Sequence, residues 1–259
     1  MLRVSLIVLT MVVISCQDAL AQACPGPCTM VVIDDAGNDV LLIDPARANT
    51  QFPPFSTFKI PNTLISLELG IVESLTSTYS VDLSKFPQQS WWPETWLQPN
   101  LTIRQAFQAS ALPIYQSFAL QVGENNMQRF VNQFEYGNRT ITDSLSGFWL
   151  NEGLKISAKE QVSFLRTLWQ QGFGLSQDIL KTFKQIMVIE NTPHFTLYAK
   201  TGGGYLQKGK ALGWYVGVVE TKNHGTFYFA FNTDGPSFKA VQGPRKTIVM
   251  HHLTQLGII

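Results

Sequence analysis

The sequence predicts an α+β domain in which strands from both ends of the chain form one antiparallel sheet, with helices from the middle packed on it and inserted into it. Two observations support this. Short β-branched and apolar runs occur near the start and again after His194, and patterns with helical spacing fill the part between them. The chain has 259 residues, of which 45% are hydrophobic and 14% are charged. This composition is typical of one globular domain with a substantial core.

The first 21 residues, 1–21, have the pattern of a signal peptide. Arg3 supplies a positive charge, residues 4–14 are almost wholly apolar, and Ala-Leu-Ala at 19–21 forms a cleavage site. A membrane anchor needs roughly 20 apolar residues, which is more than this run contains. We therefore expect residues 22–259 to form an exported domain, periplasmic or secreted, with no transmembrane segment. A lipoprotein box ending at Cys16 is a second interpretation, in which Cys16 is acylated.

The first elements of the mature chain are two strands, predicted at 29–33 and 39–43 on either side of a hairpin signature. After two prolines the pattern changes to helical spacing over 56–69, and Gly70 is suited to end that helix. Helices dominate the part of the chain that follows.

Two capping boxes, at 102–105 and 157–160, each predict the start of an amphipathic helix, and residues 178–187 predict another. The remaining elements are three neighbouring antiparallel strands and a last helix, expected at 195–200, 213–220, 226–231 and 245–256.

Charge and ligand-forming residues exclude several classes of function. The formal net charge is +1, so the chain has no excess of basic residues with which to bind nucleic acid. Cys24 and Cys28 are close enough to form a small disulfide loop in an exported protein, whereas a metal site needs further ligands with suitable spacing. The four histidines form no HExxH or HxH pattern. We therefore expect no metal.

The first candidate for chemistry is the segment from Ser56 to Lys59, where the proline-rich stretch enters a predicted helix. Residues three apart share a helix face, so the Ser56 hydroxyl and the Lys59 amine are expected within reach of each other. Serine needs an adjacent base to act as a nucleophile, and a neutral lysine or its derivative can provide one. The S-x-x-K pattern occurs about once by chance in a chain of this length, so a solvated helix start remains open.

Two further segments contain residues that can bind or activate a substrate. Lys200-Thr201-Gly202, followed by two more glycines, ends a predicted strand, where a lysine and a hydroxyl can hold a carboxylate. Ser110 lies at a break between helices, because Pro113 makes continuation of the preceding helix strained. Taken singly, the first segment is better explained as a glycine-rich turn with an exposed lysine, and the second as a joint between two helices.

Together, the three segments resemble in order and spacing the S-x-x-K, S-x-[VN] and K-[ST]-G motifs of penicillin-recognising serine enzymes. The resemblance is most specific to the class D, or oxacillinase-type, β-lactamases, and it covers nearly the whole mature chain. Four further landmarks carry it: Tyr136-Gly-Asn138, Phe148-Trp-Leu150, Gly213-Trp214 and Arg245-Lys246. The resemblance implies the serine β-lactamase and penicillin-binding-protein fold with a helical subdomain, and the hydrolysis of β-lactam antibiotics.

The resemblance also implies a role for each catalytic residue. Ser56 would be the acylated nucleophile, and Lys59 would carry a carbamate formed with CO2 and act as general base, so that no other cofactor is needed. The indole of Trp149 would hold that carbamate. Ser110, with Lys200 nearby, would pass a proton to the departing lactam nitrogen.

Substrate binding is implied for five residues near these groups. Thr201 and Arg245 would bind the substrate carboxylate, with Gly202 beside them. The backbone N–H groups of Ser56 and Gly203 would form the oxyanion hole. Leu112 stands where the family usually has valine, and its extra methylene can narrow the path by which CO2 and water reach Lys59.

Only an unprotonated amine reacts with CO2, so burial has to lower the pKa of Lys59. The apolar surroundings expected to do this are Phe58, Leu112, Tyr115 and Trp149. The alternative function is a β-lactam sensor that is acylated without efficient turnover, and a peptidoglycan transpeptidase comes third. We expect small-molecule partners only, with the chain acting as a monomer or a homodimer.

Overall fold

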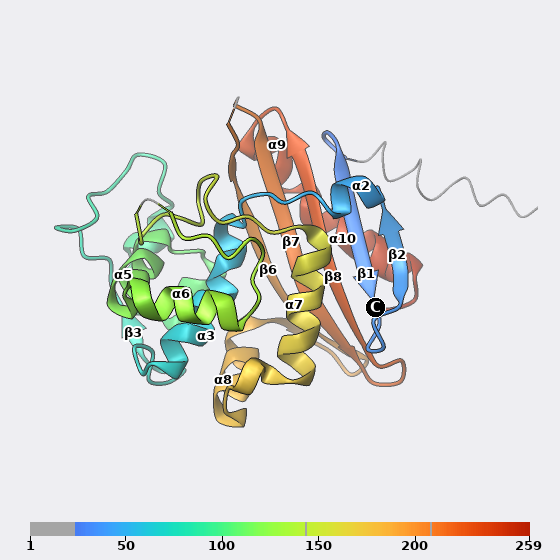
Figure 1. Cartoon of the computed structure of the whole chain (residues 1–259), viewed down its shortest axis with the longest axis horizontal. Helices are drawn as coiled ribbons and strands as arrows, with labels where there is room; N and C mark the ends of the chain where they lie inside the picture. The colour runs from blue at the N-terminus through green and yellow to red at the C-terminus, as the bar shows by residue number, and fades with distance from the viewer. Residues whose placement is uncertain (1–23, 143, 208) are drawn as a thin grey trace, which may run out of the picture.

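The computed structural model describes residues 24–142, 144–207 and 209–259. The predicted signal peptide and Cys16 lie outside the described residues. The fold is α+β, as predicted, and its centre is a sheet with the strand order β2-β1-β8-β7-β6-β5 (Figure 1). These strands are β1 (Cys28–Ile33), β2 (Asp39–Ile43), β5 (Val188–Asn191), β6 (Phe195–Tyr205), β7 (Ala211–Thr221) and β8 (Thr226–Gly235).

Strands from the two ends of the chain meet in the middle of this sheet. β1 pairs antiparallel with both β2 and β8, and Met30 is opposite Phe231. The predicted antiparallel order of the three late strands is confirmed by the β6–β7 and β7–β8 pairings. A separate small sheet joins β3 (Thr78–Tyr79) to β4 (Leu101–Thr102).

Helices cover both faces of the sheet. In Figure 1, α7 crosses in front of it, α9 and α10 lie behind it, and the remaining larger helices form a group beside it. The helices are α2 (Pro45–Ala48), α3 (Lys59–Glu68), α4 (Ile103–Gln108), α5 (Leu112–Val122), α6 (Glu124–Gln133), α7 (Ala158–Gln170), α8 (Gln177–Met187), α9 (Phe238–Gln242) and α10 (Pro244–Gln255). The 3-10 turns are η1 (Phe55–Phe58), η2 (Glu94–Leu97) and η3 (Gly172–Gly174).

Alternating side chains of the strands enter two separate cores. Val216 and Val218 of β7 pack with α3, α5 and α7 on one face, whereas Tyr215 packs with α10 on the other. The larger core is therefore shared between the sheet and the group of helices. No helix within the described part of the chain is long and apolar enough to cross a membrane.

The helix predicted over 56–69 is present, but its first turn is not α-helical. It opens with the 3-10 turn η1, and the α-helix begins only at Lys59. Pro61 has no N–H to donate to Thr57 O, and in the tighter turn before it the Thr57 N–H donates to Pro54 O over 3.1 Å. Gly70 follows the helix with φ +70°, as its expected role at the end requires.

The strand predicted over 195–200 continues for five more residues to Tyr205, so its predicted end at Lys200 is wrong. Glycines weaken isolated strands, but here Gly202, Gly203 and Gly204 pair with Trp214, Gly213 and Leu212 of β7. The short edge strand β5 was not predicted, because it has four residues and they are mostly exposed.

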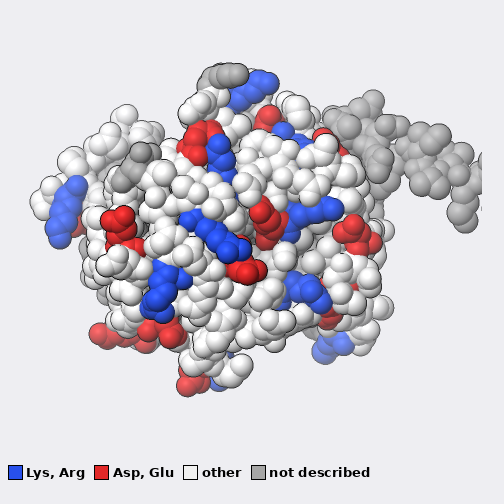
Figure 2. Space-filling view, in the orientation of Figure 1, with Lys and Arg blue, Asp and Glu red and all other residues white. Residues whose placement is uncertain are grey.

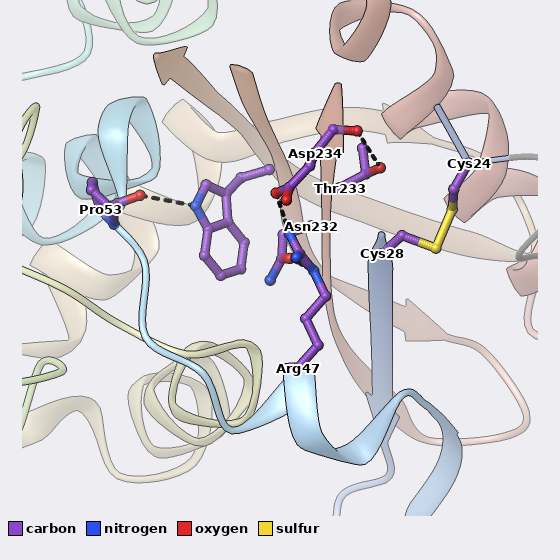
Figure 3. Close-up of polar contacts among 8 residues, drawn as sticks. Cys24, Cys28, Arg47, Pro53, Asn232, Thr233 and Asp234 are labelled. Carbon is purple, nitrogen blue, oxygen red and sulfur yellow. Dashed lines mark hydrogen bonds and ion pairs between the residues drawn. A yellow bond between two sulfur atoms is a disulfide. The ribbon is translucent and has the colours of Figure 1, made fainter. Parts of the chain in front are cut away.

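The start of the described chain is fastened to β8 (Figure 3). Cys24 and Cys28 form a disulfide. The Asp234 N–H also donates to Pro27 O over 2.9 Å. Arg47 of α2 forms an ion pair with Asp234 at 2.6 Å and donates to the Asn232 amide oxygen at 2.7 Å. These contacts fix the segment that leads into η1. The face seen in Figure 2 carries lysine and arginine side chains interspersed with acidic ones.

Candidate active site

Ser56 and Lys59 lie where η1 continues into α3. The Lys59 Nζ donates a hydrogen bond to the Ser56 Oγ over 3.1 Å, so the predicted contact between the two is present. Lys59 is 1% exposed, and this burial lowers its pKa to about 7. A lysine with its ordinary pKa of about 10.4 is almost wholly protonated at neutral pH, whereas this one is neutral in a large fraction of molecules.

Backbone and side-chain bonds from distant parts of the chain hold η1 in place. The Trp214 indole N–H of β7 donates to Pro53 O at 3.0 Å (Figure 3), and the Phe55 N–H donates to Trp149 O at 3.0 Å. The Gln161 amide of α7 donates to the Thr57 hydroxyl at 2.9 Å. Ser56 is thus anchored from both sides in sequence.

Aromatic side chains surround Lys59. Its Nζ lies 5.0 Å from the centroid of the Tyr115 ring. The neighbouring Phe58 ring stacks on Trp149 at 5.3 Å and meets Phe148 edge-to-face at 5.0 Å. Among the residues that the structure describes, the Trp149 indole N–H has no hydrogen-bond acceptor. An indole N–H without an acceptor is available to an acceptor that arrives beside it.

The Tyr136-Gly-Asn138 segment is bonded to the stretch of chain that follows Trp149. The Asn138 side chain donates to Gly153 O at 2.8 Å and accepts from the Lys155 N–H at 3.0 Å. Gly137 has φ +56°, and a Cβ there would collide with Lys155 O. Only glycine therefore permits this close approach, which fastens the loop that carries Trp149.

Ser110 and Lys200 form a second contact. The Lys200 Nζ donates to the Ser110 Oγ at 2.5 Å and to Thr201 O at 3.1 Å. Ser110 has φ +58°, an uncommon conformation that turns the chain between α4 and α5. Burial, with added repulsion from Lys59 and Arg245, holds the pKa of Lys200 well below its ordinary value. Ser56, Lys59, Ser110 and Lys200 thus belong to one cluster.

The β6 strand presents an open edge at this cluster. β5 pairs only with residues from Thr196 to Tyr198 of β6, so no other described strand covers the following stretch. A Cβ at Gly202 would lie 2.8 Å from Pro54 O, so the strand passes η1 at the closest distance that glycine allows. An uncovered strand edge offers backbone donors and acceptors to a ligand.

Arg245 lies on the opposite side of β6 from Ser110. Its Nη1 donates to Gly202 O at 2.5 Å, and a Cβ at Gly203 would come within 3.0 Å of that nitrogen. Thr201 and Gly203 share this face because strand side chains alternate. The Arg245 Nε is buried without a partner among the described residues, and burial lowers the pKa of the guanidinium to about 10.

The cluster, and Arg245 across β6 from it, contain buried basic groups without an acidic partner. In the described parts of the chain, no carboxylate lies within ion-pair distance of Lys59, Lys200 or Arg245. Burying positive charge without a counter-ion is costly, so the binding of an anionic ligand at this site is favourable. The residues that the structure describes contain no group of three or more His, Cys, Asp and Glu suited to a metal ion.

The structure brings Lys59 into contact with Ser56, and Lys200 into contact with Ser110. Leu112, the first residue of α5, is partly buried and packs against the larger core. Three aromatic neighbours were not predicted. Phe55 packs beside Ser56, the Phe107 ring lies 5.5 Å from the Lys200 Nζ, and Phe238 lies 5.9 Å from Arg245. No sequence pattern indicated them, because their roles depend on contacts between distant segments.

Comparison with known proteins places this arrangement in a family. The family model described as the penicillin binding protein transpeptidase domain matches residues 28–255. Beta-lactamase OXA-48 of Klebsiella pneumoniae is 38% identical over 213 residues, which cover 82% of this chain and 77% of that relative. Beta-lactamase OXA-5 of Pseudomonas aeruginosa is 35% identical over 231 residues, which cover 88% of this chain and 84% of that relative.

Solved structures agree in both fold and family. FUS-1 (OXA-85), a class D beta-lactamase from Fusobacterium nucleatum subsp. polymorphum, superimposes with a TM-score of 0.85 at 31% identity, covering 94% of this chain and 98% of that structure. The class D beta-lactamase YbXI from Nostoc gives a TM-score of 0.83 at 31% identity, covering 92% and 98%.

Proposed function

This chain belongs to the class D β-lactamases, a family of serine hydrolases, and on that premise we propose that it opens β-lactam rings through an acyl-enzyme formed on Ser56. The observation that carries the proposal is the Lys59–Ser56 contact of 3.1 Å, made by an amine whose pKa is about 7. A serine beside a base of this kind can be deprotonated as it attacks.

In acylation, the Ser56 Oγ forms a bond to the lactam carbonyl carbon and loses its proton toward Lys59. The backbone N–H groups of Ser56 and Gly203 stabilise the negative oxygen. The C–N bond of the lactam then breaks, and the Ser110 hydroxyl passes a proton to the nitrogen. Lys200, at 2.5 Å from the Ser110 Oγ, orients that hydroxyl.

The face of β6 that carries Thr201 orients the substrate. β-Lactams bear a carboxylate beside the ring nitrogen, and the unpartnered side of the Arg245 guanidinium provides its charge-assisted donor. The Thr201 hydroxyl and the backbone at Gly202 complete this subsite. Leu112, the first residue of α5, would narrow the approach of water to the ester.

A CO2-derived carbamate on Lys59 fits the residues present, and when bound it would supply a stronger general base for both half-reactions. Lys59 is buried, and its pKa of about 7 leaves about half of the amine neutral at pH 7. Among the described residues its Nζ has one hydrogen-bond partner, Ser56. The Trp149 indole N–H, without an acceptor among the described residues, would hold it. The surrounding rings of Phe58 and Tyr115 exclude the water that would favour the ammonium form.

The proposal includes the site of action. Residues 1–21 direct export, and residues 22–259 form the catalytic domain outside the cytoplasm. The experiment that tests the proposed reaction is steady-state hydrolysis of benzylpenicillin by wild type and Ser56→Ala, with and without bicarbonate. Wild type should turn over and respond to bicarbonate after CO2 removal, whereas Ser56→Ala should not turn over. Equal hydrolysis by both proteins would refute Ser56 as the nucleophile.

A further inference from the structure

Phe55 directly precedes the proposed nucleophile in an uncommon backbone conformation. Its φ is +49°, in the left-handed region that bulky residues rarely occupy. The side chain is only 3% exposed, and the backbone N–H is bonded to Trp149 O at 3.0 Å. Such a conformation persists only when the surrounding structure fixes it. The position of the Phe55 ring is therefore determined by what it packs against.

The ring packs against the bare backbone of β6 at Gly204. A Cβ added at Gly204 would lie 2.7 Å from Cδ1 and 2.9 Å from Cζ of Phe55, and closer still to Cε1. Real Cβ atoms do not approach that closely, so the ring occupies the space that any side chain at 204 would need. One step along the same face, Gly202 meets Pro54 O and Thr57 in the same way.

These contacts place η1 against the β6 edge at two points. Gly202 rests on the backbone of η1 and its entry, and Gly204 rests on the flat face of the Phe55 ring. Ser56 follows the ring in η1, and Gly203 lies between the two glycines in β6. The thickness of the ring therefore helps to set the separation between the Ser56 and Gly203 backbones.

We propose that Phe55 is a positioning residue whose ring acts as a spacer between η1 and β6 and sets the width of the oxyanion hole. The proposal rests on the proposed function, in which the Ser56 and Gly203 N–H groups hold the carbonyl oxygen. Such donors are effective only at about 2.7–3.1 Å from that oxygen. A ring that fixes their separation tunes transition-state binding without touching the substrate.

The test compares Phe55→Ala, Gly204→Ala and the double variant. Acylation is followed by stopped flow with nitrocefin. The carbonyl stretch of the acyl-enzyme is recorded by infrared difference spectroscopy after reaction with a carbapenem at mildly acidic pH without bicarbonate. Phe130→Ala is the matched control, because Phe130 is a buried ring on α6 that packs against Phe134 and not against the Gly204 backbone. Phe55→Leu keeps apolar volume without the flat ring and serves if Phe55→Ala does not fold.

Phe55→Ala should slow acylation by about tenfold to a hundredfold, as expected for a small misplacement of reacting groups. Its acyl carbonyl should absorb at higher frequency, because weaker hydrogen bonds polarise it less. Gly204→Ala should do the same by displacing the ring. In the Phe55→Ala background, Gly204→Ala should have little further effect, since the ring it displaces is absent.

Two outcomes would contradict the proposal that Phe55 is a spacer. One is a Phe55→Ala protein that loses thermal stability like Phe130→Ala while its acylation rate and carbonyl frequency stay at wild-type values. The other is a Gly204→Ala effect that is undiminished without the ring. A wild type that forms no acyl-enzyme with any β-lactam would instead refute the proposed function, and the spacer with it.

Discussion

The Lys200 Nζ lies 2.5 Å from the Ser110 Oγ, although the two residues are 90 positions apart in the sequence. Lys200 comes from the open edge of β6, and Ser110 from the turn between α4 and α5. The contact therefore joins the sheet to the group of helices at the candidate active site. It also leaves the Ser110 hydroxyl proton free to point elsewhere, because the lysine is the donor.

If Lys200 acts through Ser110, their substitutions should not be additive. Ser110→Ala should lower the acylation rate by about a hundredfold, the range for loss of a proton-transfer group. Lys200→Met, which keeps the side-chain volume, should lower it strongly in wild type but little further in Ser110→Ala. Stopped-flow acylation with nitrocefin measures all four proteins. Fully multiplicative losses would show that Lys200 acts independently of Ser110.

Arg245→Ala should lower kcat/KM for benzylpenicillin by about tenfold to a hundredfold, because charge-assisted hydrogen bonds contribute about 1.5–3 kcal/mol. Arg245→Lys should recover only part of this loss, since lysine cannot make the two-pronged contact with a carboxylate. The exposed neighbour Lys246 provides the control, and Lys246→Ala should retain activity. Equal kcat/KM for wild type and Arg245→Ala would remove Arg245 from the substrate site.

Activity should depend on pH and bicarbonate through Lys59, whose pKa is lowered to about 7. Only the neutral amine reacts with CO2, so the reactive fraction falls as the pH drops through that value. Between pH 8 and pH 6 it declines from about nine tenths to about one tenth. In degassed buffer, benzylpenicillin hydrolysis should fall over this range and recover when bicarbonate is added. If the hydrolysis rate at pH 6 changes neither on degassing nor on addition of bicarbonate, the base is an unmodified Lys59.

Trp149→Phe should slow deacylation and let the acyl-enzyme accumulate, because it removes the indole N–H while keeping an apolar ring stacked near Phe58. Trp149→Ala should show the same trapping with a further loss of stability of about 3–5 kcal/mol from the cavity it leaves. Intact mass during benzylpenicillin turnover detects the adduct. If Trp149→Phe turns over like wild type and bicarbonate restores nothing, the indole does not hold the base.

The sequence predicted those parts of the site that depend on local spacing. Ser56 and Lys59 are three apart on one helix face, and the structure places their functional atoms 3.1 Å apart. The capping boxes at Thr102 and Ser157 formed as expected, since each involves only four neighbouring residues. The order of the late strands followed from short turns between long β-branched runs.

Features that depend on contacts between distant segments were not predictable in this way. β6 continues past Lys200 through three glycines because η1 lies directly against it. No residue near Gly204 in the sequence indicates that the Phe55 ring packs there. Sequence patterns likewise could not place Lys200 against Ser110. The family resemblance supplied their roles, whereas the geometry that makes the roles physically reasonable comes from tertiary packing.

The most direct test of the central claim is the intact mass of the protein during a single exposure to excess benzylpenicillin, followed from milliseconds to hours. We predict one covalent adduct of the mass of the intact antibiotic, absent in Ser56→Ala, that disappears as the substrate is consumed in bicarbonate-containing buffer. Its loss should leave unmodified protein able to react again. A well-folded wild type that never gains mass would contradict acylation at Ser56, and one that stays acylated for hours with saturating bicarbonate would be a β-lactam sensor and not a β-lactamase.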